Sequence, residues 1–190
     1  YLLGTGTEES ERLKAQHQVW SAATNELWDH AEFGLGTSLL DLGCGPGFAA
    51  IELAGRVGSS GAVLAVDEST RFIDSLVRQV TRRGLRQLTA RVERAEALTL
   101  ERGSLDGVFA RWLFCFLADP DVVVARVANG LRPGGRFVVQ DYLNYRATTL
   151  QPRSCAFDRV IAAVEASWRR TGAALDVGGR LPGLLARHGC

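Results

Sequence analysis

The chain has 190 residues, of which 46% are hydrophobic and 23% are charged, and its formal net charge is +1 at pH 7. This length and composition predict one folded domain with a buried core and exclude a disordered chain. The near-neutral charge argues against a nucleic-acid partner. No apolar run approaches the ~18 residues that a membrane span requires, so no membrane partner is expected either.

The four cysteines are scattered along the chain, without a CxxC pair and without a histidine at metal-ligand spacing. We therefore expect reduced thiols in a cytoplasmic protein, with neither a disulfide nor a metal site. The first ten residues lack the layout of a secretory signal. The chain holds no methionine and stops abruptly at Cys190, so we expect that residues are missing at both ends.

The first predicted element is an amphipathic helix over residues 8–31. Side chains recur at three- and four-residue steps along one face of it, namely Leu13, Gln16, His17, Trp20, Thr24, Leu27 and Trp28. Two interpretations stay open, a helix that packs across the domain and a lid over a ligand. Of the three histidines, His17 on this helix is the one expected near a site. Gly34 and Gly36 end the helix.

A strand, a tight glycine turn and the start of a helix are predicted over residues 38–56. Apolar residues 39–42 lead into Gly43, Gly45 and Gly47, and apolar side chains at helical spacing follow from Phe48. Three glycines in five residues allow positive φ angles and the close approach of a ligand. The free N–H groups and the positive dipole end of the helix face the same place, so the turn predicts a ligand site.

Strands and helices then alternate along the chain. Strands are expected over residues 62–66, 89–93, 108–111 and 136–141, and helices over residues 70–83 and 122–131, with a turn at 133–135. The alternation predicts parallel strands joined by right-handed crossovers. A helix over 157–168, a glycine-rich loop over 172–179 and a short helix over 181–187 complete the chain.

Three segments converge on the carboxyl ends of the predicted strands, where open parallel sheets bind ligands. They are the glycine turn, Asp67 with Glu68, and the loop at residues 94–96. Asp67 lies twenty residues after Gly47, at the end of the second strand, where a carboxylate can accept hydrogen bonds from the two hydroxyls of a ribose. The alternative role for Asp67 is an N-cap of the next helix.

The glycine spacing distinguishes two kinds of nucleotide. A dinucleotide site uses GxGxxG, but Phe48 stands where the third glycine would fall, and Pro46 occupies the interior of the turn. The chain also has a single lysine, Lys14, so no Tyr-Lys pair for hydride transfer is evident. These features favour a nucleoside without phosphate.

The segments LLDLGCGPG, VLAVDEST, ADP and LRPGGRFVV together resemble the class I S-adenosylmethionine-dependent methyltransferases, over residues 39–141. YLLG…ERLKAQ and QDYLNY…P…SW also resemble bacterial small-molecule members of that superfamily. The resemblance implies a Rossmann-like, doubly wound α/β fold with a mostly parallel sheet, whose usual C-terminal strand hairpin is missing from this chain. It divides the chain into an N-terminal helical lid (1–36), a cofactor-binding core (37–141) and a helical acceptor-side segment (142–190).

The resemblance also implies roles for individual residues toward S-adenosylmethionine. Gly43, Cys44 and Gly45 would contact its methionine portion, with Asp41 beneath the amino group. Asp67 would bind the ribose, and Glu68 would lie beside the adenine. Arg111 and Trp112 would border the methionine end and the acceptor pocket. Gln16 would close over the cofactor, with Arg12 and Tyr1 as further candidates.

One position departs from the family pattern. Arg94 stands where an acid usually accepts a hydrogen bond from the adenine amino group. The backbone N–H of Ala95 can still donate to the ring, and Glu93 or Glu96 can compensate for the missing acid.

The predicted function is methyl transfer from S-adenosylmethionine to an oxygen, nitrogen or carbon atom of a small molecule, by a monomer or a homodimer. A general base is optional for this chemistry, and the candidates are Asp141, Tyr142 and Tyr145. Each has an alternative role, a turn or capping residue for Asp141 and a pocket wall for the tyrosines. Two other functions stay open, an NAD(P)-binding oxidoreductase and a catalytically silent methyltransferase-like binding domain.

Overall fold

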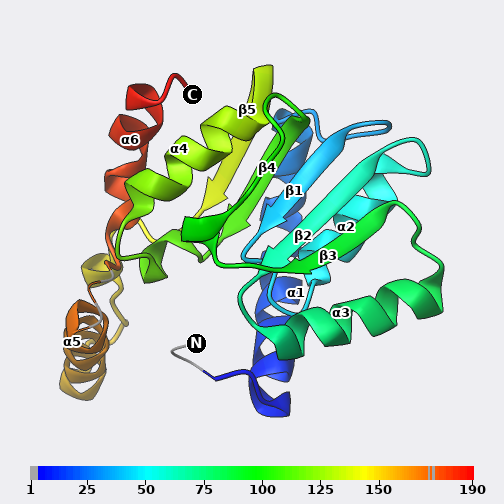
Figure 1. The fold of residues 1–190 in the computed structure, drawn as a ribbon. Helices are drawn as coiled ribbons and strands as arrows, with labels where there is room; N and C mark the ends of the chain where they lie inside the picture. The colour runs from blue at the N-terminus through cyan, green and yellow to red at the C-terminus, as the bar shows by residue number, and fades with distance from the viewer. Residues whose placement is uncertain (1–3, 171, 173) are drawn as a thin grey trace.

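The computed structural model describes residues 4–170, 172 and 174–190, in which five parallel strands form one sheet with helices on both faces (Figure 1). The strands are β1 (Ser38–Leu42), β2 (Ala62–Asp67), β3 (Leu88–Val92), β4 (Leu105–Arg111) and β5 (Leu131–Gln140), in the order β3-β2-β1-β4-β5. The strands all run parallel, and the order in which they are added switches from one side of β1 to the other between β3 and β4. This order confirms the predicted Rossmann-like α/β fold.

The helices divide between the two faces of the sheet. Side chains from α1 (Thr7–His30), α2 (Phe48–Val57) and α3 (Thr70–Arg83) share one core, and those from α4 (Pro120–Gly130) and α6 (Leu181–Arg187) share the other. Helix α5 (Cys155–Arg170) lies apart from the sheet, beyond the carboxyl ends of the strands (Figure 1). None of the helices described here is long and apolar enough to cross a membrane.

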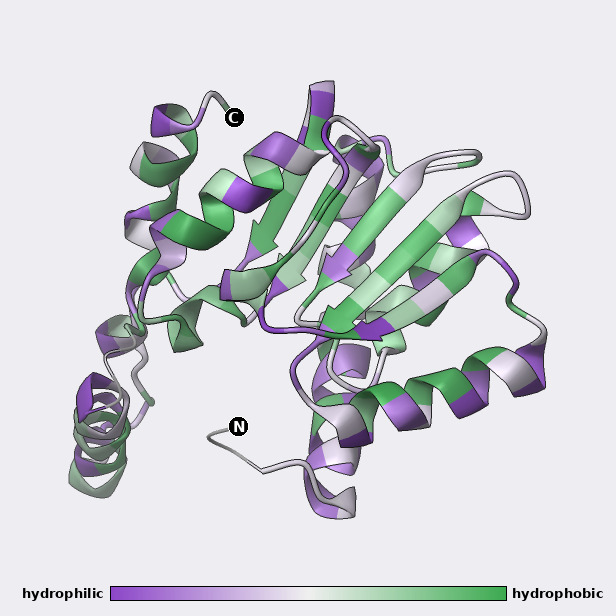
Figure 2. Ribbon diagram, in the orientation of Figure 1, coloured by the Kyte–Doolittle hydropathy of each residue, from purple (hydrophilic) through white to green (hydrophobic). Residues whose placement is uncertain are grey.

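The two cores follow from the alternation of side chains along each strand. In β1, Leu39 packs in the core of Trp28 and Leu53, while Leu40 and Leu42 pack in the core on the opposite face. Because both faces are covered, the central strands are hydrophobic almost throughout, whereas α3 alternates between polar and apolar residues (Figure 2). Short 3-10 helices η1 (Ala95–Ala97), η2 (Phe114–Phe116), η3 (Tyr145–Ala147) and η4 (Val177–Gly179) lie in the connections.

The start of β5 differs from the sequence prediction. A helix to Leu131 and a turn at 133–135 are expected, but the helix ends at Gly130 and the strand begins at Leu131. Leu105 pairs with Leu131, and Gly107 pairs with Arg136. Residues 132–135 of β5 therefore stand opposite the single residue Asp106 of β4 and bulge out of the ladder. Gly134, with a φ of 80°, permits this excursion.

Candidate active site

A cavity of about 340 Å³ opens at the carboxyl ends of the strands. It is lined by every residue that the sequence predicts for the cofactor: Gln16, Asp41, Gly43, Cys44, Gly45, Asp67, Glu68, Arg94, Ala95, Arg111 and Trp112. Arg12 also lines it, whereas Tyr1 lies outside the described residues. The structure thus brings the predicted residues together, and their roles toward a ligand stay predictions.

The glycine turn between β1 and α2 leaves no room for side chains. Gly43, Gly45 and Gly47 have φ angles of 73°, 53° and 85°, a region that other residues rarely adopt. A Cβ atom on Gly47 would lie 2.3 Å from Leu76 Cδ1, and one on Gly43 would lie 3.0 Å from Leu113 Cδ1. Packing therefore requires glycine at 43 and 47, and Gly43 and Gly45 line the cavity.

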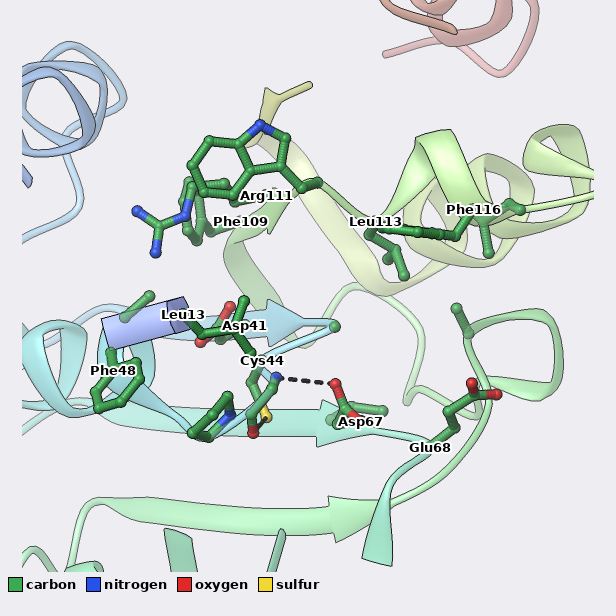
Figure 3. Close-up of a pocket in the computed structure, with 18 of the residues that line it drawn as sticks. Leu13, Asp41, Cys44, Phe48, Asp67, Glu68, Phe109, Arg111, Leu113 and Phe116 are labelled. Carbon is green, nitrogen blue, oxygen red and sulfur yellow. Dashed lines mark hydrogen bonds between the residues drawn. The ribbon is translucent and has the colours of Figure 1, made fainter. Parts of the chain in front are cut away.

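Asp67 ties the end of β2 to this turn. Its Oδ2 accepts a hydrogen bond from the Gly45 N–H at 2.8 Å (Figure 3), and its Oδ1 accepts one from the Ser69 N–H at 2.8 Å. Burial raises the pKa of this carboxyl group, and the two N–H donors oppose that rise. The N-cap of α3 is Ser69 and not Asp67. Each carboxylate oxygen keeps lone-pair capacity for a further donor.

Asp41 lies below the turn, and 2% of its surface is exposed. Burial raises its pKa from 3.8 to about 7, although the nearby Arg111 guanidinium lowers it. Among the described residues, its Oδ2 has no hydrogen-bond partner. A buried carboxylate oxygen without a partner is costly, so this position fits a ligand that brings a donor or a positive charge.

The opposite rim carries the departure from the family pattern. The Arg94 guanidinium lies 3.9 Å from the Glu68 carboxylate and 3.7 Å from that of Glu96. The Glu93 carboxylate pairs with Arg91 at 2.5 Å and accepts a hydrogen bond from the Thr99 N–H. Two guanidiniums meet three carboxylates at this rim, so it keeps one net negative charge.

A buried polar network joins α1 to the ends of β4 and β5. Arg111 donates to His17 Nδ1 at 2.9 Å and to Thr24 Oγ1 at 3.1 Å, and Thr24 donates to Gln140 Oε1 at 2.9 Å. Because arginine only donates, His17 Nδ1 accepts, so its Nε2 carries the hydrogen that faces Glu52 Oε1 at 3.0 Å. Burial lowers the pKa of Arg111, and nearby Asp41 and Glu52 oppose that effect.

The sequence predicts His17 near the site and Thr24 on the same helix face, but it does not predict the partners of either residue. The spacing of seven residues between them is the signal that a single buried face joins them. Trp28 on that face is fully buried, whereas Trp20 is 44% exposed.

The upper wall of the cavity is apolar apart from Arg111 (Figure 3). Phe109, Leu113 and Phe116 lie across from Asp41, Cys44 and Asp67 (Figure 3). Burial raises the pKa of the Cys44 thiol well above its usual range, so this side chain stays protonated.

The three candidates for a general base occupy different places. The Asp141 carboxylate accepts hydrogen bonds from the N–H groups of Cys115 at 3.2 Å and Tyr142 at 2.8 Å, and Asp141 does not line the cavity. Tyr142 lines the cavity, and burial raises its pKa to about 12. The Tyr145 ring lies 5.2 Å from that of Tyr142 and faces a second, neighbouring cavity.

The comparison with known proteins agrees with this geometry. Residues 40–139, more than half of the chain, match the family described as a methyltransferase domain. The chain belongs to this family. The methyltransferase chain is 36% identical over 110 residues to aklanonic acid methyltransferase DauC of Streptomyces sp. (strain C5), covering 58% of the chain and 50% of DauC. It is 34% identical over 101 residues to nocamycin O-methyltransferase of Saccharothrix syringae, covering 53% of the chain and 36% of that relative.

The fold also matches solved methyltransferase structures. Geranyl diphosphate C-methyltransferase from Streptomyces coelicolor A3(2), in complex with Mg²⁺, geranyl diphosphate and S-adenosyl-L-homocysteine, superposes with a TM-score of 0.73 at 19% identity. The match covers 96% of this methyltransferase chain and 65% of that one. The predicted class I S-adenosylmethionine-dependent methyltransferase family, and S-adenosylmethionine as its cofactor, are confirmed. The chain covers 50% of the length of DauC and 36% of that of nocamycin O-methyltransferase.

Proposed function

We propose that the protein transfers a methyl group from S-adenosylmethionine to a small molecule. The observation that carries the proposal is the pair of buried carboxylates beside the glycine turn. Asp41 has an oxygen without a partner among the described residues, and Asp67 has one donor on each oxygen. Asp41 suits the ammonium group of the cofactor, and Asp67 suits its ribose hydroxyls. A phosphate group at this place would instead be repelled by the two carboxylates, because all three groups are negatively charged.

The chain's own residues position the reactants. The bound cofactor supplies a methyl group activated by a positively charged sulfur. Gly43, Cys44 and Gly45 hold its amino-acid portion, while Ala95 and Glu68 contact the adenine. Arg111 and Trp112 lie between the amino-acid portion of the cofactor and the acceptor. Alignment of the acceptor atom behind the methyl carbon, in a site closed by α1, provides the catalysis.

Calorimetric titration tests the proposal against its alternatives. We expect S-adenosylhomocysteine to bind and NAD(P) not to bind, and a labelled methyl group to pass from S-adenosylmethionine to a small molecule in a cell extract. Binding of NAD(P) with no response to S-adenosylhomocysteine would establish an oxidoreductase instead. Binding without any transfer would identify a catalytically silent domain.

A further inference from the structure

The part of the cavity beyond the ends of β4 and β5 is built from flat or apolar side chains. We call it the aromatic half, and it comprises Trp112, Leu113, Phe116, Leu117, Tyr142 and Trp168. The rings of Phe116 and Trp168 pack with centroids 5.4 Å apart and planes tilted by 40°. Surfaces of this kind bind aromatic molecules through contact area and ring stacking.

Trp112 is a rigid wall of this half. Its φ of 49° is in the left-handed region, which is strained for a residue with a large side chain. The backbone N–H of Trp112 donates to the backbone carbonyl of Gln140 at 2.9 Å. Trp20 packs edge-on against the indole at 5.8 Å, and the Arg111 guanidinium lies 5.1 Å from its centroid. The indole is therefore fixed before any acceptor arrives.

The cations that border the aromatic half already have partners. Arg12 donates to both carboxylate oxygens of Glu9 at 2.7 and 2.8 Å. Arg111 is bonded to His17 and Thr24. The charge of Arg12 is balanced by Glu9, and that of Arg111 by the nearby Asp41 and Glu52, so neither an anionic nor a cationic acceptor meets an unbalanced charge. Since a charge buried without a partner is costly, the cavity favours an uncharged acceptor.

Within the described residues, the aromatic half offers no side chain that is open to take a proton. The Glu9 carboxylate is paired, and that of Asp141 is held by two backbone N–H groups. The raised pKa of Tyr142 keeps its phenol protonated at neutral pH, so it can donate a hydrogen bond but not act as a base. The acceptor must therefore lose its proton to water.

We propose that the acceptor is an uncharged, planar aromatic molecule whose own weakly acidic hydroxyl is methylated. The inference rests on the proposed function and names its acceptor class. The hydroxyl proton passes to water, and the oxygen's electron pair forms the new bond to the methyl carbon. The electron pair of the broken carbon–sulfur bond returns to sulfur, so the positive charge leaves with the proton.

Binding of three matched probes tests the acceptor class. Quenching of tryptophan fluorescence in the presence of S-adenosylhomocysteine reports the affinity for naphthol, naphthoate and naphthylmethylamine. We expect naphthol to bind at least tenfold more tightly than either charged probe. Equal or tighter binding of a charged probe would overturn the proposal, as would binding of none of the three. Affinity for S-adenosylhomocysteine, measured separately by calorimetry, shows whether the proposed function itself survives.

A variant locates the binding site. Phe116→Ala should lower the affinity for naphthol about tenfold while S-adenosylhomocysteine still binds. Leu35→Ala is the control, because Leu35 is 82% exposed and does not line the cavity, and it should change neither affinity. Unchanged naphthol binding in Phe116→Ala would refute the assignment to the aromatic half.

The pH dependence of methyl transfer tests the source of acidity. The rate should rise with pH around the pKa of the acceptor hydroxyl itself. A naphthol made more acidic by a nitro group should therefore lower the pH midpoint of the rate by the difference between the pKa values of the two naphthols. Tyr142→Phe should leave that midpoint in place. A midpoint that is the same for both acceptors would show that a side chain takes the proton.

Discussion

Asp41 and Asp67 show how two aspartates of one site acquire different roles. Both are buried, with 2% and 5% of their surfaces exposed. Asp67 has a backbone N–H on each oxygen, whereas one oxygen of Asp41 has no partner within the described part of the chain. Asp67 therefore presents a carboxylate that is already hydrogen-bonded and fixed in direction. Asp41 presents a carboxylate oxygen that a positively charged group of a ligand would stabilise.

Replacement of Asp67 by alanine should weaken S-adenosylhomocysteine binding by about 1.5–3 kcal/mol, because it removes hydrogen bonds to a charged group. Calorimetry measures the dissociation constant. Asp74→Ala, at an exposed position of α3, is the control and should bind normally. A dissociation constant that Asp67→Ala leaves unchanged would refute the ribose assignment.

The raised pKa of Asp41 has a defined sign in the ligand-free protein. Its folded value of about 7 exceeds the ordinary 3.8, so between these values the unfolded chain releases a proton that the folded protein keeps. The contribution of Asp41 to the free energy of unfolding therefore falls as pH rises from 3.8 to about 7. A bound ammonium group would stabilise the ionised carboxylate and reverse this loss.

Cofactor binding should consequently tighten as pH rises toward about 7, with release of a proton from Asp41. Calorimetry with S-adenosylhomocysteine at about one pH unit below this value, in two buffers of different ionisation enthalpy, measures the protons released. Asp41→Asn should bind more weakly and release none from this position. Equal proton release in Asp41→Asn and the unaltered protein would contradict the role of Asp41.

At the scale of elements, the turn before α2 and the body of α2 respond oppositely to alanine. Gly47→Ala should destabilise the protein by about 2–4 kcal/mol, because its φ of 85° is strained and its Cβ would overlap Leu76. Gly55→Ala, inside α2 with open space around it, should stabilise by up to about 1 kcal/mol. Chemical denaturation measures both, and similar effects at the two positions would show that the turn carries no strain.

Local patterns made part of this architecture predictable. The glycines at 43–47 need no distant partner to indicate a turn, and Asp67 follows an apolar strand in a regular way. The bond between Arg111 and His17, 94 residues apart, could not be predicted from the sequence. The left-handed backbone of Trp112 and the bulge of β5 also depend on neighbours that only the tertiary structure brings together.

At the scale of the whole molecule, cofactor binding should raise thermal stability. S-adenosylhomocysteine at a hundredfold excess over its dissociation constant adds about 2.7 kcal/mol, which corresponds to a rise of about 5–10 °C in Tm for a domain of this size. Differential scanning calorimetry measures the shift. NAD(P) at the same concentration should leave Tm unchanged, and an equal rise with NAD(P) would contradict the proposed specificity.

The bonds from α1 to Arg111 and Gln140 have a consequence for how the protein is made on the ribosome. Strands β1 to β3, with the glycine turn and Asp67, can assemble once residues 38–92 have left the ribosome, because their pairings are local in sequence. Thr24 must wait for Gln140, 116 residues later. Helix α1, which is synthesised before the sheet, thus reaches Arg111 and Gln140 only after strands β1 to β3 exist.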